Sequence, residues 1–238
     1  MNPYANHLRE ALPRVQDAVA EAAVRSGRRP EDVRLVAVTK AHPDGVVDAA
    51  LEAGLTDLGE NRVEGLAARL ETKHRDRPAW SAVRWHMIGH IQSRKAATVA
   101  QIADWVQSVD SLKLARRLSA AAGDAGREID VLVQVNTSGE DAKGGFSAQE
   151  AVEAVHAVTD LPGLKVQGLM TMAPFIEDEA ILRSVFAGLR GLRDRCRELP
   201  GFGAGELSMG MSNDFEIAIE EGSTMVRLGT VLFGRRPT

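Results

Sequence analysis

The chain of 238 residues is 44% hydrophobic and 26% charged, which is enough to bury the core of one large domain or two small ones. A net charge of -4 argues against nucleic-acid binding, because nucleic-acid binders usually carry a basic excess. A single cysteine excludes an internal disulfide, and the polar, acid-containing N-terminus is unlike a signal peptide, so the sequence predicts a cytoplasmic protein. No apolar run approaches the ~20 residues of a membrane span.

Strand-like and helix-like segments alternate along the chain with short connections. After a helix-like stretch at residues 8–26, short apolar and β-branched runs predict eight buried strands. The predicted strands lie at residues 34–40, 56–59, 84–88, 105–109, 129–136, 164–172, 206–209 and 225–229. A helical pattern follows each of them, at residues 44–53, 61–72, 92–102, 111–125, 147–159, 178–198, 213–221 and from 230.

This alternation favours an α/β fold, a parallel (β/α)8 TIM barrel with an extra N-terminal helix. A doubly wound open sheet has the same alternation and stays an alternative, because periodicity does not show whether the sheet closes. The chain contains no domain linker, repeat or low-complexity tract, so we expect residues 1–238 to form one domain.

Lys40 is a charged residue that interrupts an apolar strand pattern, and it lies at the end of the first predicted strand. It shares side-chain direction with Val36 and Val38. In a barrel, functional groups gather at the carboxyl ends of the strands, so its amine would stand at the mouth of the barrel if that direction is inward. The alternative is a lysine that extends from the strand end to solvent.

Arg227 is the second exception, inside the apolar strand predicted at 225–229. An arginine there needs an acceptor, because an unpaired buried charge costs several kcal/mol. The acceptor could be a ligand or a neighbouring carboxylate, and the sequence leaves both open.

The loops after the seventh and eighth strands, at residues 208–214 and 229–230, predict an anion site. In TIM barrels, the loops after these two strands commonly bind phosphate. Gly229 lets backbone N–H groups approach an anion, and the hydroxyls of Ser212 and Thr230 can donate to it. A single Ser or Thr here could instead be a helix cap.

Other signals are weaker. His86 and His90 flank a strand end without the glutamate of a zinc-protease motif, so we expect no metal site. Cys196 lies in a charged, helix-like stretch, where we expect no reactive role.

One ligand could satisfy the amine, the anion site and the arginine together. Pyridoxal 5'-phosphate carries an aldehyde that condenses with an amine, a phosphate, and a ring nitrogen that accepts a hydrogen bond. A Schiff-base aldolase for a sugar phosphate would explain Lys40 and the anion site, but it would leave Arg227 unexplained.

The sequence resembles the pyridoxal-phosphate homeostasis family, also called YggS/PROSC-like, from about residue 33 to the end. The matching segments are LVAVTK (35–40), GEN (59–61), WHMIGHIQS (85–93), NTSGEDAKGG (136–145), GLMTM (168–172) and LSMGMSNDFEIAIEEGSTMVRLGTVLFG (207–234). The resemblance implies a PLP-binding barrel like the N-terminal domain of alanine racemase. One departure is Arg94, where the family commonly has Asn, which puts only the shape of that loop in doubt.

The resemblance also implies which residues bind the cofactor. It assigns seven cofactor-binding residues by motif: Lys40, Asn61, His86, Ser212, Arg227, Gly229 and Thr230. Lys40 would form the Schiff base and Arg227 would face the pyridine nitrogen. Ser212 and the two residues after the eighth strand would hold the phosphate. Asn61 and the strand end from His86 to His90 would line the ring.

Two functions remain, a non-enzymatic carrier in PLP homeostasis and an amino-acid racemase that uses the same Schiff base. Racemases of this fold take one base, a tyrosine, from a second domain, whereas the only tyrosine here is Tyr4 and the chain ends soon after the eighth unit. An arginine opposite the ring nitrogen also makes the ring a weaker electron sink. We therefore expect a carrier with no catalytic residues. It would be a monomer or weak dimer and could deliver PLP to apo-enzymes, without nucleic-acid or membrane partners.

Overall fold

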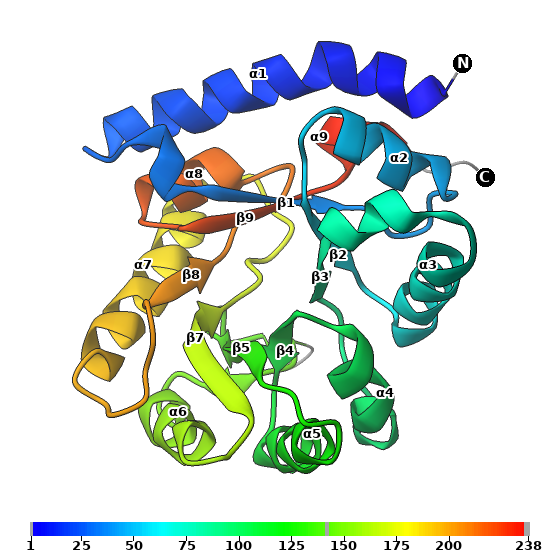
Figure 1. Cartoon of the computed structure of the whole chain (residues 1–238). Coiled ribbons are helices and arrows are strands. Elements are labelled where there is room, and N and C mark those ends of the chain that lie inside the picture. The colour runs from blue at the N-terminus through cyan, green and yellow to red at the C-terminus, as the bar shows by residue number, and fades with distance from the viewer. Residues whose placement is uncertain (1, 141–142, 236–238) are drawn as a thin grey trace.

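A closed ring of parallel strands forms the centre of the molecule (Figure 1). The computed structural model describes residues 2–140 and 143–235, with all of their side chains except those of 73–76. The barrel strands are β1 (Arg34–Val38), β2 (Asp57–Glu60), β3 (Arg84–Met87), β4 (Trp105–Val109), β5 (Ile129–Asn136), β7 (Leu164–Met170), β8 (Glu206–Ser208) and β9 (Met225–Leu228). The ring closes because β4 pairs with both β3 and β5, while β9 pairs with both β8 and β1.

Helices surround this ring, and each barrel strand is followed along the sequence by one of them (Figure 1). The helices are α1 (Pro3–Arg25), α2 (Gly45–Glu52), α3 (Val63–Asp76), α4 (Ala96–Ile102), α5 (Leu112–Asp124), α6 (Ala151–Thr159), α7 (Glu179–Cys196), α8 (Phe215–Glu220) and α9 (Thr230–Phe233). Short 3-10 turns lie at Pro30–Asp32, Pro78–Ala82 and Ser93–Lys95. The predicted (β/α)8 barrel with an extra N-terminal helix is confirmed, and the open sheet is excluded.

The strand bounds agree closely with the sequence patterns, and β4 and β5 begin and end at the predicted residues. The first strand is the instructive difference. A strand was predicted over 34–40, but β1 ends at Val38 because the chain turns at Lys40 and Ala41, where Ala41 has a φ of 61°. The short strand β6 (Phe146–Ser147) was not predicted; it pairs in parallel with the last two residues of β5.

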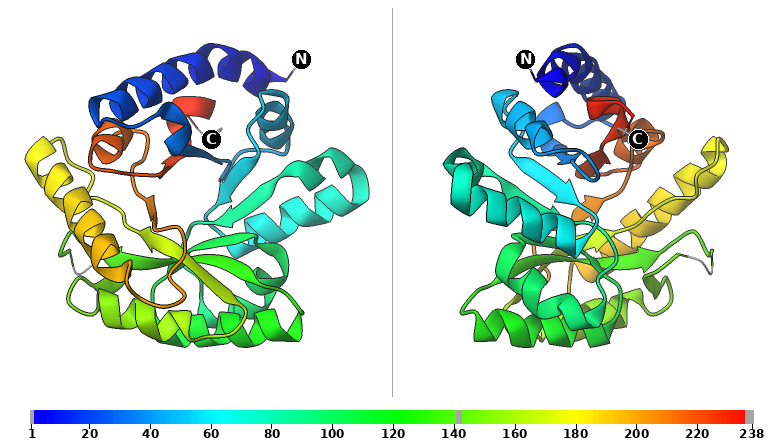
Figure 2. Two further views of the ribbon diagram at one scale, coloured as in Figure 1. Left: turned by 60° about the vertical axis from the view of Figure 1, so that its left-hand side comes forward. Right: turned by 90° about the vertical axis from the view of Figure 1, so that its right-hand side faces the viewer.

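The N-terminal helix α1 covers one side of the barrel. Asn2 caps it, since the Asn2 side-chain oxygen accepts from the backbone N–H of Tyr4 at 3.0 Å. Its buried apolar residues recur at helical spacing: Leu8, Leu12, Val15 and Val19. In both views of Figure 2 α1 lies outside α2, α8 and α9, which are eight, six and four residues long. A long extra helix therefore covers apolar surface that these short helices leave open.

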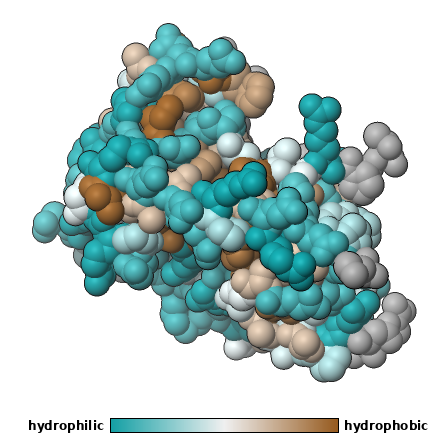
Figure 3. Space-filling view, turned by 90° about the horizontal axis from the view of Figure 1, so that it is seen from above, coloured by the Kyte–Doolittle hydropathy of each residue, from teal (hydrophilic) through white to brown (hydrophobic). Residues whose placement is uncertain are grey.

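The outer face of α1 is turned to solvent. Seen from above, hydrophilic side chains cover most of this side of the molecule, and apolar side chains are visible in small separate groups (Figure 3). Among the helices in residues 2–140 and 143–235, none is long and apolar enough to cross a membrane.

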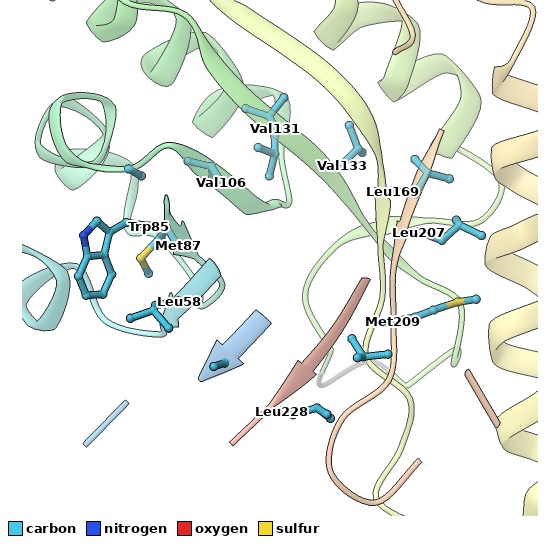
Figure 4. Close-up of a cluster of buried hydrophobic side chains, with 14 of the residues drawn as sticks. Leu58, Trp85, Met87, Val106, Val131, Val133, Leu169, Leu207, Met209 and Leu228 are labelled. Carbon is cyan, nitrogen blue, oxygen red and sulfur yellow. The ribbon is translucent and has the colours of Figure 1, made fainter. Parts of the chain in front are cut away.

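Successive strand residues alternate between the helices and the barrel interior, as pleated strands require. The outward residues form one large apolar core with the helices, and Figure 4 shows members from most of the strands. The inward residues form a much smaller apolar cluster: Val36, Trp105, Leu132, Met170 and Met225. Much of the remaining interior is polar, because inward positions on β2, β3, β4, β8 and β9 carry Asp57, His86, Gln107, Ser208 and Arg227.

Candidate functional site

A cavity of about 980 Å³ opens at the carboxyl ends of the strands. Residues at or after the ends of all eight barrel strands line it, which is where TIM barrels carry their functional groups. Six of the seven predicted site residues are among them: Lys40, Asn61, Ser212, Arg227, Gly229 and Thr230. The fold thus brings together side chains that are up to 190 positions apart in the sequence.

The turn that carries Lys40 is held from the side by buried groups. The Thr39 hydroxyl donates to Glu60 Oε1 at 2.8 Å, and Arg69 donates to the carbonyl of His42 at 2.6 Å. Arg69 also approaches Glu60 at 3.4 Å. Burial raises the pKa of Glu60, although the Thr39 hydroxyl and the Arg69 guanidinium oppose that change. These contacts fix the backbone on both sides of Lys40, which is half-buried and lines the cavity.

Arg227 comes from β9 and its guanidinium is buried. It donates to Ser208 Oγ at 2.6 Å and to the carbonyl of Thr171 at 2.9 Å. Burial lowers the pKa of Arg227 to about 10, although the charge of Asp214 opposes this shift. The side chain is therefore still a cation at neutral pH. Since guanidinium has five N–H groups, it keeps donors for a ligand in the cavity.

The two loops predicted to bind an anion meet at the cavity. The backbone N–H of Val231, in the first turn of α9, donates to Ser212 Oγ at 3.4 Å. Gly229 and Thr230 lie beside this contact and line the same cavity. Two hydroxyls and the backbone N–H groups of these loops form a set of donors with the chemistry that a phosphate requires.

Asn61 lies where two loops come very close together. A Cβ atom on Gly89 would be 2.1 Å from the carbonyl oxygen of Asn61, so only glycine fits at this position. The approach of the two loops places Asn61 and His90 on the same cavity. His90 Nδ1 lies 2.8 Å from Asp110 Oδ2, to which a ring N–H can donate, and the His90 ring is largely exposed.

His86, by contrast, does not line the cavity, although the resemblance implied that it would line the cofactor ring. It is fully buried in the barrel interior, where it stacks on Trp105 with ring centroids 5.6 Å apart. Its two ring nitrogens lie 2.9 Å from Asp57 and from Gln107. The motif around His86 fixed its strand but not its depth, and His90 is the histidine that reaches the cavity.

Several lining residues were not predicted as binding residues. Asp110 directly follows β4, and Gln134 points inward from β5, where it donates to the carbonyl of Gly144 at 2.7 Å. A polar residue at a strand end, or at an inward position of an apolar strand, is the signal that could have found them. Lys143 also lines the cavity, and its amine donates to the carbonyl of Ala173 at 2.8 Å.

A metal would need ligands that are not gathered anywhere in the described part of the chain. There, no group of three or more His, Cys, Asp and Glu side chains could hold a metal ion. The lone cysteine, Cys196, is buried on α7 and does not line the cavity, and burial raises the pKa of its thiol.

Comparison with known proteins places the chain in a family. Residues 15–237 match the family model of the alanine racemase N-terminal domain. A pyridoxal phosphate homeostasis protein of Pseudomonas aeruginosa is 41% identical over 228 residues, covering 95% of each chain, and one of Escherichia coli is 36% identical, covering 97% of each. The solved structure of PipY from Synechococcus elongatus, with PLP bound, is 34% identical with a TM-score of 0.78. It covers 91% of this chain and 100% of that chain.

The barrel and its cavity thus define a protein of the alanine racemase N-terminal domain class. Within this class, the chain belongs to the family of pyridoxal phosphate homeostasis proteins. The resemblance noted in the sequence is therefore confirmed.

Proposed function

We propose that this protein binds pyridoxal 5'-phosphate as a Schiff base on Lys40 and acts in PLP homeostasis, without substantial catalysis. The observation that carries the proposal is the meeting of three groups in one cavity: the Lys40 amine, the Arg227 guanidinium and the donors of the Ser212 and Thr230 loops. The names of the relatives and the PLP bound in PipY support it.

The residues present fit the chemistry of this cofactor. The Lys40 amine would attack the aldehyde carbon, and water would leave as the C=N bond forms. The hydroxyls of Ser212 and Thr230, with the backbone around Gly229, would donate to the phosphate oxygens. Arg227 can only donate, so it suits a ring nitrogen that stays unprotonated.

The test of the proposal is chemical trapping on Lys40. The purified protein, loaded with pyridoxal 5'-phosphate, is reduced with borohydride and digested, and the modified lysine is mapped by mass spectrometry. We expect the adduct mainly on Lys40 and a strongly reduced Schiff-base absorption in Lys40→Ala. The matched control is Lys165→Ala, since Lys165 is exposed near the start of β7, at the opposite end of the barrel. An adduct mainly on a lysine other than Lys40 in the wild type would refute the assignment.

Lys143 is the lysine that could take over when Lys40 is absent. It lines the same cavity, so we expect Lys40→Ala to keep a minor adduct at Lys143. The double variant Lys40→Ala/Lys143→Ala should lose this residual adduct as well.

We further propose that the bound cofactor is handed to apo-enzymes in the cytoplasm and that the protein works as a monomer or weak dimer. Net charge and the single cysteine are compatible with this setting. Mixing the loaded protein with an apo-PLP enzyme should restore that enzyme's activity faster than free PLP at the same free concentration. Equal rates would argue for storage alone.

The second candidate, a racemase, rests on one observation in the cavity, the contact between His90 and Asp110. A carboxylate next to a histidine is a common arrangement for a general base. Tyr4 gives no support, because it packs on His42 at the N-terminal end of α1 and does not line the cavity.

A further inference from the structure

A continuous chain of hydrogen bonds runs through the barrel interior from Arg227 to the amino end of β2. Arg227 donates to Ser208 Oγ at 2.6 Å, and Ser208 Oγ lies 2.7 Å from Gln107 Oε1. Gln107 Nε2 is 2.9 Å from His86 Nδ1, and His86 Nε2 is 2.9 Å from Asp57 Oδ1. All five side chains are buried. Of these five side chains only Arg227 lines the cavity, so the other four can act on a ligand there only through Arg227.

The donors and acceptors of this chain have only one consistent direction. Arginine has no acceptor, so the Ser208 hydroxyl must accept from Arg227 and give its own proton to Gln107 Oε1. This fixes the Gln107 amide, whose NH2 group then donates to His86 Nδ1. His86 is left with its proton on Nε2, from which it donates to Asp57.

The opposite direction does not fit these contacts. If His86 carried a proton on Nδ1, the Gln107 amide would have to turn and point its NH2 group at Ser208. The Ser208 hydroxyl would then face donors on both sides and have no acceptor for its proton. Turning the amide would also place its oxygen against Met225 Sδ, which now lies 2.9 Å from Gln107 Nε2.

The far end of the chain is anchored by charge and stacking. Asp57 Oδ2 accepts from Arg84 at 2.6 Å. Trp105 stacks on the His86 ring at an interplanar angle of 19°, and the Arg34 guanidinium lies 5.1 Å from the Trp105 centroid. Burial lowers the pKa of His86, although Asp57 opposes this shift, which agrees with the neutral ring that the chain requires.

We propose that Ser208, Gln107 and His86 are positioning residues, which hold the Arg227 guanidinium in the orientation that recognises an unprotonated ring nitrogen in the cavity. The proposal rests on the function proposed above and deepens it. None of the three side chains lines the cavity, so any effect they have on ring recognition passes through Arg227. Among these hydrogen-bonded side chains the only carboxylate is that of Asp57. It is four hydrogen bonds away from Arg227, and Arg84 compensates its charge.

The direction of the chain can be tested without cofactor. Nitrogen-15 NMR of histidine-labelled apo-protein distinguishes the two neutral tautomers, and the His86 signal is assigned by its loss in His86→Gln. We expect His86 to be neutral with its proton on Nε2, also below pH 6.5, with Asp57, Arg84 and Arg34 as the charged groups that act on it. A proton on Nδ1, or an imidazolium at neutral pH, would overturn the proposed direction.

The positioning role is tested with two aldehydes, pyridoxal 5'-phosphate and an analogue whose ring nitrogen is replaced by C–H. The wild type should prefer the nitrogen ring. In Ser208→Ala and Gln107→Leu we expect this preference to fall about tenfold, the factor that corresponds to 1.4 kcal/mol of binding energy, while the carbon analogue binds as before. The matched control is Ser119→Ala, because Ser119 is also buried but donates to the Pro162 carbonyl on the outside of the barrel.

The outcomes separate the proposals. A preference that stays unchanged in both chain variants would overturn the positioning role, even if the variants are less stable. A wild type that binds neither aldehyde would overturn the proposed function and the positioning role with it, whereas the NMR result would still report the direction of the chain. If one variant fails to fold, the other and the wild-type NMR spectrum decide.

Discussion

The two layers of the barrel differ in chemistry and in how they use burial. Between strands and helices, apolar side chains such as Phe186 on α7 and Leu58 on β2 are fully buried in one continuous core. Inside the ring, a small apolar cluster shares the space with buried polar groups, of which Gln107 and His86 are completely enclosed.

This difference shows where stability and specificity come from. Apolar contacts are non-directional, so the outer layer stabilises the fold without fixing one side-chain arrangement. Buried hydrogen bonds cost free energy when they are broken, and each has a donor and an acceptor. The inner layer can therefore set an orientation at the cavity, which the outer layer cannot.

The largest expected effect on the free energy of unfolding comes from the outer layer. Phe186→Ala removes a fully buried ring and should cost about 3–5 kcal/mol, measured by urea denaturation. The control is Phe175→Ala, because Phe175 is 85% exposed at the cavity and should change the free energy of unfolding little. Similar losses in the two variants would contradict the division between the layers.

A smaller effect is expected on binding at the cavity. Ser212→Ala combined with Thr230→Ala should weaken binding of pyridoxal 5'-phosphate by about 3 kcal/mol, because hydrogen bonds to charged groups contribute about 1.5–3 kcal/mol each. Unphosphorylated pyridoxal should bind as it does to the wild type. The double variant Ser147→Ala/Thr159→Ala serves as control, and equal losses for both aldehydes would mean that the phosphate is held elsewhere.

A third prediction concerns the inner layer and pH. Burial lowers the pKa of His86 below its usual 6.5, so the unfolded chain takes up a proton first as the pH falls. The contribution of the neutral His86 ring to the free energy of unfolding is therefore complete above pH 6.5 and is lost as the pH falls below it. For one proton, the free energy of unfolding changes by at most about 1.4 kcal/mol per pH unit. His86→Gln should show a flatter decline in the free energy of unfolding between pH 6.5 and 5. Parallel curves would contradict the neutral, buried state of His86.

The smallest expected effect is turnover of amino acids in the cavity. Incubated with L-alanine in heavy water, the loaded protein should exchange the Cα proton slowly and with retained configuration, since Lys40 offers a base on one face only. Formation of D-alanine near the usual enzymatic rates of about 1–10³ s⁻¹ would establish a racemase. In that case, loss of the activity in His90→Gln would identify the second base.

Much of the fold could be predicted from the sequence because alternation and strand length are local properties. Strands β4 and β5 match the predicted bounds, since their apolar runs are ended by polar residues on both sides. The end of β1 was missed because the turn at Lys40 is held by Glu60 and Arg69, which come from other parts of the chain. The pairing of β6 with β5 is likewise a tertiary contact without a pattern of its own.

Site residues could be predicted where they directly follow a predicted strand end, as Lys40 and Thr230 do. His86 shows the limit of that argument. The parity of strand residues predicts which way a side chain points but not how far along the barrel axis it lies, and His86 lies in the interior. A histidine and a glutamine at inward positions of neighbouring strands are a signal of an internal network, but their partners on β8 and β9 become known only when the ring is closed.

The contact between Gly89 and Asn61 has a consequence for engineering. Because any side chain at position 89 would overlap the Asn61 carbonyl, a library that randomises position 89 would be enriched in misfolded members. The segments after β2 and β3 pack directly against each other and therefore form one structural unit. A graft that moves this corner of the cavity onto another barrel must transfer both segments together, with the glycine in place.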